Sequence, residues 1–188
     1  MVDGNQRISA QTFDVDDVEE IITTIRQAEP IDARAILGLM RHVGRDTKYL
    51  TFGPEGSFLN VKQERQLIEQ YAQAERSILL VIEVDEQIIG IANLATLDND
   101  KQSHVAEVGI SIIKEYWGYG IGRIALESLI EFATSVGIMV LTLEVVTENQ
   151  RAINLYKRLG FEIKGTLSKR LRSGQLYFDS YVMEKILY

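Results

Sequence analysis

Three glycines occupy every second position between Trp117 and Arg123, at Gly118, Gly120 and Gly122. Because glycine has no Cβ atom, such a run can take positive φ angles and turn several backbone N–H groups toward one point, where they bind an anion. The amphipathic helix predicted directly after the run adds unpaired N–H groups and the positive end of its dipole. We therefore predict that this run, called the glycine turn below, binds a phosphate-bearing ligand. The alternative is a turn that holds no ligand.

A predicted helix over 149–159 carries two further candidates, Asn149 and Tyr156. They are seven residues apart, so they lie on one helix face about 10 Å apart along the axis, and one ligand can touch both. A phenol in this place is a candidate general acid that protonates a departing thiolate. The alternative is a half-buried tyrosine whose hydroxyl group bonds to backbone.

Two glutamates are candidates for a general base. Glu144 is expected in a strand over 140–146, and partial burial there would raise its pKa toward the working range of a base. The alternative for Glu144 is a structural carboxylate paired with a neighbouring helix. Glu107, on the strand before the glycine turn, is the second candidate and could act through water.

Several other classes of site are disfavoured. The glycine turn lacks the Gly-Lys pair of a P-loop. A looser dinucleotide pattern runs from Gly120 to Ala125 with Glu144 about 20 residues on, but little chain remains for the further βαβ units that fold requires. His42 and His104 are expected at a helix end and a strand start. No metal-ligand spacing and no serine nucleophile elbow occurs, so we expect no metal.

Composition indicates one cytoplasmic domain. The chain has 188 residues, 46% of them hydrophobic, no cysteine and a formal net charge of −7. Residues 1–20 hold six acidic residues against one basic residue, and we expect them to form a flexible lead-in to a domain over 21–188. The remainder is nearly balanced in charge, which argues against a nucleic-acid partner, and no apolar run is long enough to span a membrane.

Periodicity predicts an α/β fold of the α+β type, with a mixed, mostly antiparallel sheet of six to seven strands and helices on both faces. Asp32 is expected to cap the first helix, which ends near His42, and Asn60 with Gln63 to cap the second. The predicted strands are 21–28, 78–84, 87–97, 104–113, 140–146, 161–169 and 176–186, with a polar turn at 98–101 and helices at 121–136 and 149–159.

The stretch 110–161 resembles the Gcn5-related N-acetyltransferase (GNAT) superfamily. Residues 112–122 are similar to its pyrophosphate loop, with Trp117 in place of the usual Gln or Arg, a variant associated with ribosomal-protein alanine and amino-acid acetyltransferases. Residues 143–161 resemble the strand and helix that carry the family's Asn and Tyr.

This resemblance implies transfer of acetyl from acetyl-CoA to a primary amine through a tetrahedral oxyanion, with Tyr156 as acid and Glu144 as base. It also implies that the strands ending at Ile113 and Val146 splay apart, so that backbone of the first strand pairs with the pantetheine arm and supplies the oxyanion donor. The residues implied to bind the donor are Ile110, Ser111, Ile112, Trp117, Gly118, Tyr119, Gly120, Ile121, Gly122, Arg123, Asn149, Asn154 and Tyr156.

The acceptor is expected to be a small-molecule amine or a peptide N-terminus. Residues 45–59 and 172–177 are expected to shape its site, although neither segment carries a recognisable motif. A homodimer is possible. The alternative to an enzyme is a non-catalytic module that binds acyl-CoA.

Overall fold

The computed structural model describes residues 21–96 and 99–188. The predicted lead-in and part of the predicted turn at 98–101 lie outside these residues. The strands are β1 (Thr23–Gln27), β2 (Ile78–Val84), β3 (Gln87–Thr96), β4 (Val105–Ile112), β5 (Val140–Val146), β6 (Glu162–Ser173) and β7 (Leu176–Ile186). The helices are α1 (Ala33–Asp46), α2 (Val61–Gln73), α3 (Ile121–Ser135) and α4 (Gln150–Arg158), with a 3-10 turn η3 (Lys114–Tyr116) before the glycine turn.

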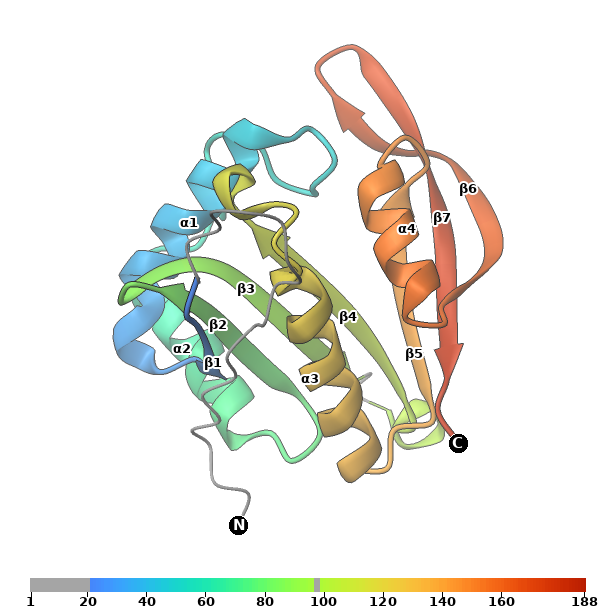
Figure 1. Ribbon diagram of the computed structural model, residues 1–188, viewed down its shortest axis with the longest axis horizontal. Helices are drawn as coiled ribbons and strands as arrows, with labels where there is room; N and C mark the ends of the chain where they lie inside the picture. Colours follow the sequence, from blue (N-terminus) through green and yellow to red (C-terminus); the bar gives the residue numbers. More distant parts are fainter. Residues whose placement is uncertain (1–20, 97–98) are drawn as a thin grey trace, which may run out of the picture.

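The seven strands form one sheet in the order β1-β2-β3-β4-β5-β7-β6 (Figure 1). Every neighbouring pair is antiparallel except β4 and β5, which are parallel. The predicted mixed, mostly antiparallel sheet is therefore confirmed. The dinucleotide alternative is wrong, because its fold needs a largely parallel sheet.

Helices cover both faces of the sheet, as predicted. Alternate strand residues point to opposite faces, so Val81 packs beneath α1 and α2 with Ile36 and Ile68. On the other face, Leu143 of β5 packs with Leu129 of α3 and other buried side chains. The sheet thus separates two apolar cores, with α3 and α4 on the same side (Figure 1).

Both α1 and α2 begin where the sequence predicts, with Asp32 and Asn60 at their N-cap positions, but only α2 has the predicted side-chain cap. The Asn60 side chain accepts hydrogen bonds from the backbone of Lys62 and Gln63, and the Gln63 side chain accepts one from the Asn60 N–H. Asp32 makes no capping bond to α1. Its carboxylate instead accepts two hydrogen bonds from the Arg26 guanidinium, at 2.8 and 3.0 Å, because this charged pair is the stronger partner.

Helix α1 also runs one turn further than predicted, to Asp46 rather than His42. The added turn is held by packing, since Val43 and Gly44 are buried. A Cβ atom at Gly44 would lie 2.0 Å from the carbonyl oxygen of Gly53, so the loop after α1 sits directly on this turn. Glycine permits the close approach.

Strands β4 and β5 are paired over only part of their length. The paired positions end at Glu107 and Thr142, whereas β4 continues to Ile112 and β5 to Val146. Figure 1 shows the two strands side by side near the C-terminus and apart at the opposite end, between α3 and α4. The predicted splay is confirmed, and we call the space between the separated strands the gap.

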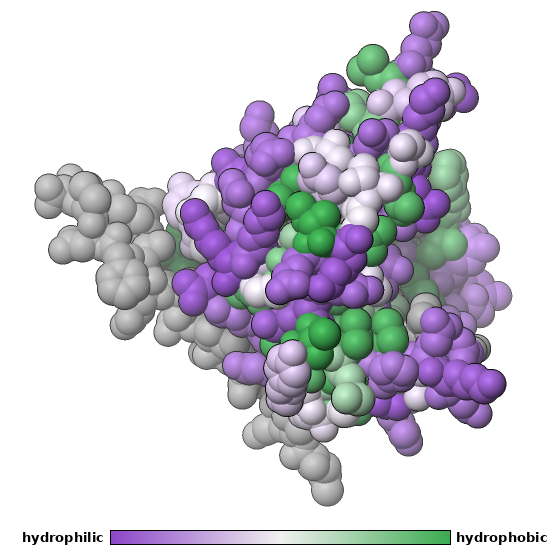
Figure 2. All heavy atoms as spheres, turned by 90° about the vertical axis from the view of Figure 1, so that its right-hand side faces the viewer, coloured by the Kyte–Doolittle hydropathy of each residue, from purple (hydrophilic) through white to green (hydrophobic). Residues whose placement is uncertain are grey.

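Figure 2 views the molecule from the β6 and β7 side, where hydrophilic side chains predominate and smaller apolar areas lie among them. The exposed apolar residues of this hairpin include Ile163, Leu176, Tyr177 and Ile186. In the described part of the chain, no helix has the length and apolar character needed to cross a membrane.

Candidate active site

The β4 wall of the gap presents backbone groups to it. Ile113 donates its N–H to the Ile89 carbonyl on β3 at 3.0 Å, and peptide groups of successive residues point to opposite sides of a strand. The peptide groups of Ile110 and Ile112 therefore point into the gap, whereas those of Ser111 point to β3. The expectation that all three backbones face the donor is wrong for Ser111 because of this alternation.

One of these backbone groups is already occupied. The indole Nε1–H of Trp117 donates to the Ile112 carbonyl at 2.7 Å. Trp117 thus fastens the glycine turn to the end of β4, a role that an indole N–H can fill where the family's pattern has Gln or Arg.

The glycine turn has the geometry of an anion site. Gly118 and Gly120 have φ angles of +96° and +79°, and Gly120 is the N-cap of α3. Nothing lies within 4 Å of a Cβ built on Gly120, so its φ angle, and not crowding, demands glycine there. Among the described residues, the backbone N–H groups of 118–122 have no hydrogen-bond partner. These unpaired donors at a helix N-terminus fit a pyrophosphate.

The other residues of the glycine turn do not have the positive φ angles of Gly118 and Gly120. A Cβ on Gly122 would lie 3.3 Å from Leu155 Cδ2 and close to Ile112, so Gly122 lets α3 approach α4. Ile121 is buried in the core, and only its backbone is available to a ligand. Tyr119 is exposed at the rim.

Arg123 lies on the solvent face of α3, where its Nε bonds Glu127 at 2.8 Å and its side chain is 68% exposed. Arg151, which the sequence interpretation did not include, is the cation beside the glycine turn. Its guanidinium lies 5.2 Å from the centre of the Trp117 ring, and its Nη1 is 4.0 Å from the Cβ position of Gly118. Only the fold brings α4 against this turn, so no local signal marked Arg151.

Tyr156 lies on α4 with its ring packed edge-on against Phe161, at 5.7 Å between centroids. The residue is 7% exposed, and burial raises the pKa of its hydroxyl group to about 12. Burial is the single cause of this raised pKa and no hydrogen bond from a described residue contributes to it, in contrast to the alternative in which backbone bonds the hydroxyl group. The phenol is therefore protonated at neutral pH and free to donate.

The two asparagines of this segment lie differently. The Asn149 side chain caps α4 by accepting a hydrogen bond from the Ala152 N–H at 3.3 Å, and the backbone N–H of Asn149 donates to the Val146 carbonyl. Asn149 thus fixes the end of β5 against the start of α4. Asn154 is exposed on the surface of α4.

Glu144 lies on the sheet face opposite to α3 and α4, and its side chain is 39% exposed. Both of its oxygens accept hydrogen bonds from Arg170 of β6, from Nε at 2.8 Å and from Nη2 at 2.9 Å. As expected from alternation along β5, Glu144 lies on the face of Thr142 and points away from the core under α3, but the predicted partial burial is not found, because this face is open at Glu144. Its partner belongs to a strand and not to a helix.

Glu107 occupies the same face at the point where the strands part. It is close enough to Tyr71 of α2 for its negative charge to add to the effect of burial, which raises the pKa of the Tyr71 phenol. Tyr71 accepts a hydrogen bond from Asn93 Nδ2 at 3.4 Å. Glu107 also contributes, after Glu144, to raising the pKa of Arg170. The two acids therefore flank one arginine.

One of the segments expected to shape the acceptor site, 45–59, reaches the final hairpin on this face, next to the other expected segment, 172–177. Tyr49, from the loop after α1, packs edge-on against Phe178 of β7 at 6.0 Å, and Lys48 Nζ lies 5.0 Å from the same ring. The gap thus has the glycine turn and Tyr156 on one side of the sheet and the acids with their aromatic wall on the other.

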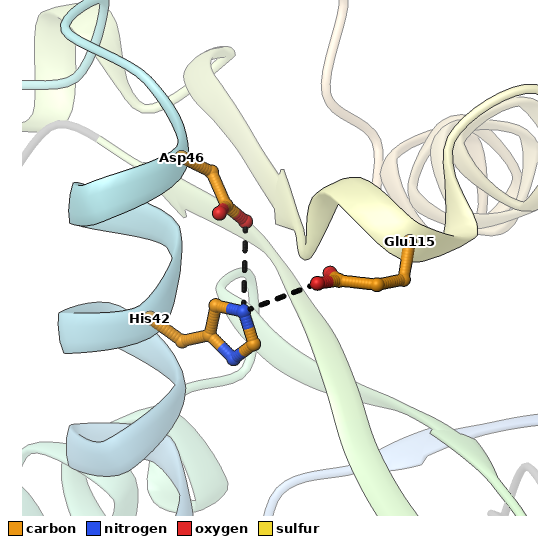
Figure 3. Close-up of side chains that lie close together, drawn as sticks. All are labelled: His42, Asp46 and Glu115. Carbon is orange, nitrogen blue, oxygen red and sulfur yellow. Dashed lines mark ion pairs between the residues drawn. The ribbon is translucent and has the colours of Figure 1, made fainter.

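A separate cluster joins α1 to η3 (Figure 3). His42 Nε2 lies 3.9 Å from Asp46 Oδ2 and 3.6 Å from Glu115 Oε1, and Asp46 Oδ2 also accepts the Lys114 N–H at 3.0 Å. Two arginines of α1, Arg41 and Arg45, line the hollow beside it. Their positive charge opposes cation binding, so we interpret the cluster as a link between helix and turn.

A parallel strand pair that separates beyond Glu107, with the glycine turn at its edge, is the arrangement that the resemblance to the GNAT superfamily implies. Comparison with known proteins agrees, since residues 47–161 match the Acetyltransferase (GNAT) family. The chain belongs to this family and is an N-acetyltransferase.

Two relatives illustrate the match in sequence and structure. The chain is 31% identical to the L-amino acid N-acetyltransferase AaaT of Escherichia coli over 109 residues, which cover 57% of this chain and 67% of that protein. A GNAT-family acetyltransferase structure from Streptococcus pneumoniae superposes with a TM-score of 0.85 at 30% identity, covering 88% of this chain and 99% of that one.

Two further structures have the same fold. Ribosomal-protein-alanine N-acetyltransferase from Brucella melitensis has a TM-score of 0.76 at 27% identity, covering 87% and 99% of the two chains. The yncA protein from Salmonella typhimurium, solved with acetyl-CoA, has a TM-score of 0.78 at 22% identity, covering 88% and 94%.

Proposed function

We propose that this enzyme binds acetyl-CoA in the gap and transfers the acetyl group directly to a primary amine that enters from the opposite sheet face. The observation that carries the proposal is the position of the gap. It opens beyond Glu107 and Thr142, with unpaired N–H groups of the glycine turn at its rim and the unbonded hydroxyl of Tyr156 on the helix beside it.

The donor site is built from backbone groups and the side chains of Arg151, Asn149 and Asn154. The N–H groups of 118–122 bind the pyrophosphate, and Arg151 adds a positive charge to them. The gap-facing peptide group of Ile110 pairs with the pantetheine arm in the manner of an added strand. Asn149 holds the α4 end of the site in place, and Asn154 is assigned to its outer edge.

Acetyl-CoA supplies an acetyl thioester. An N–C bond forms between the amine and the acetyl carbon, the C–S bond breaks, the amine loses one proton to the base, and the coenzyme A sulfur leaves as a thiolate that takes one proton from solvent. Complete transfer from a phenol of pKa about 12 to a thiolate of pKa about 8.5 is uphill. Tyr156 therefore acts by donating a hydrogen bond to the sulfur as negative charge develops on it.

Of the two acids, Glu107 is the better proton acceptor in this arrangement. Both oxygens of Glu144 already accept hydrogen bonds from Arg170, whereas no described residue forms a hydrogen bond to the side chain of Glu107. Glu107 also stands where the strands separate. We assign the base to Glu107, acting directly or through water, and keep Glu144 as the second candidate.

Ligand-dependent stabilisation tests the donor assignment. Acetyl-CoA at about 100 times its Kd should stabilise the fold by about 2.7 kcal/mol, which raises Tm by about 5 to 10 °C for a domain of this size. NADH serves as the control, because it also carries a pyrophosphate. No shift with acetyl-CoA, or an equal shift with NADH, would contradict the proposal. The expected cytoplasmic location and a possible homodimer stay predictions.

A further inference from the structure

A break in the β6–β7 ladder directs Arg170 toward the sheet. Leu167 pairs with Ser180 and Leu171 with Phe178, so the three residues between them on β6 face only Asp179 on β7. Lys169 in this bulge has a φ angle of +52°, an unusual value for a lysine, and its N–H donates to Asp179 Oδ1 at 2.7 Å. Bulges of this kind redirect a side chain.

Arg170, next to Lys169, consequently reaches a strand that is not its neighbour. Strand β7 lies between β6 and β5, yet the Arg170 guanidinium bonds Glu144 of β5 through Nε and Nη2. The hydrogen bond to Asp179 holds Lys169 at a positive φ angle, which a lysine does not otherwise favour. The strained backbone at Lys169 thus places the Arg170 guanidinium beside the gap.

The contact with Glu144 uses only one edge of the guanidinium. A guanidinium has five N–H donors in a planar fork, and a carboxylate that bonds Nε and Nη2 leaves Nη1 and the second Nη2 hydrogen. Among the described residues no acceptor bonds these remaining donors. They form the edge that binds a second carboxylate in bidentate geometry.

We propose that Arg170 binds the carboxylate of the acceptor, which makes the preferred acceptor a free α-amino acid. This inference rests on the proposed function, since it concerns the same site. The arrangement of charges supports it, because Glu107 attracts the ammonium group while Arg170 binds the carboxylate next to it. Glu144 holds Arg170 in place and is a positioning residue in this scheme.

The same charges disfavour the other acceptor classes. A polyamine has no carboxylate for Arg170 and is repelled by it. A peptide N-terminus has an amide where an amino acid has its carboxylate, so the outer edge of the guanidinium would stay without an anionic partner. Coenzyme A release from the complete enzyme can separate these cases.

The experiment compares the twenty L-amino acids, their α-amides and spermidine as acceptors at saturating acetyl-CoA. We expect kcat/KM for the best amino acid to exceed that for its amide by at least tenfold. In Arg170→Gln this preference should fall to within about threefold, through loss on the amino acid and not on the amide, while KM for acetyl-CoA stays unchanged. Arg170→Lys should keep part of the preference.

Arg34→Gln, at an exposed position on α1, is the control and should keep the full preference. Equal use of acids and amides, preference for spermidine, or an equal loss on both substrates in Arg170→Gln would overturn the inference while leaving acetyl transfer intact. Failure of every amine to release coenzyme A would instead overturn the proposed function. Circular dichroism and Tm of each variant show that it is folded.

Discussion

Glu107 of β4 and Thr142 of β5 form the last paired position between the only two parallel neighbours in the described sheet. Beyond this pair β4 and β5 are no longer hydrogen-bonded to each other, so the peptide groups that face the gap are available to a ligand. The parallel pair is therefore where the sheet opens. The gap at this position is bordered by the glycine turn and Tyr156 on one face of the sheet and by Glu107 and Glu144 on the other.

Tyr156→Phe should lower kcat by about a hundredfold and leave acetyl-CoA binding intact, because it removes the hydrogen bond to the sulfur and keeps the ring that packs on Phe161. Steady-state coenzyme A release measures kcat, and calorimetry measures binding. An unchanged kcat would reject the role of Tyr156. This variant also separates the enzyme from a module that only binds acyl-CoA.

Arg151 and Arg123 should differ in donor binding. Arg151→Gln is expected to weaken acetyl-CoA binding about tenfold, since its guanidinium lies beside Gly118, whereas Arg123→Gln should change it less than twofold because Arg123 faces solvent beside Glu127. Calorimetric titration of both variants makes the comparison. An equal loss of acetyl-CoA affinity in both variants, or a larger loss in Arg123→Gln, would show that Arg123 of α3 contacts the donor.

Gly120→Ala should damage both stability and donor binding. Gly120 and Gly137 have φ angles of +79° and +73°, so alanine at either position costs about 1 to 2 kcal/mol of folding free energy. Only Gly120 belongs to the glycine turn, and only its variant should lose acetyl-CoA affinity. Urea denaturation and calorimetry of the two variants test this, and equal affinities would show that the turn is not the donor site.

Alkaline pH should destabilise the fold through Tyr156. Its folded-state pKa of about 12 lies above the ordinary phenol value of 10, so the stabilising contribution is complete below pH 10 and is lost as the pH rises toward 12. The loss amounts to about 1.4 kcal/mol per pH unit in that window. Urea denaturation at pH 9 and pH 11 should show a smaller decrease for Tyr156→Phe than for the wild type.

Tyr177→Phe is the control variant, because it removes a hydroxyl group from a residue that is 57% exposed. Its unfolding free energy should decrease with pH as in the wild type. The same decrease in both variants would mean that another group dominates alkaline unfolding.

The ends of the helices could be predicted from local sequence patterns. Asn60 with Gln63, and Gly160 with a φ angle of +86°, mark helix ends because the side chain or its absence satisfies backbone groups next to it. The positive φ angles at Gly118 and Gly120 are of the same kind. Such features need only neighbours in the chain, and they were predicted correctly.

The missed features depend on residues far apart in the chain. Arg151 reaches Trp117 only when α4 packs against the glycine turn, and Arg170 reaches Glu144 only through the bulge at Lys169. Lysine gives no signal of a positive φ angle. Asp32 occupies the predicted N-cap position of α1 but makes no capping bond, because its carboxylate bonds Arg26 of β1.

The central claim is direct transfer of acetyl from acetyl-CoA to an amine at the gap. The most direct measurement follows coenzyme A thiol release and N-acetylated product together, with and without a mixture of L-amino acids, their α-amides and spermidine. We predict release that requires the amine, with one thiol formed for each acetylated product. Equal release without amine, or none with it, would contradict the account.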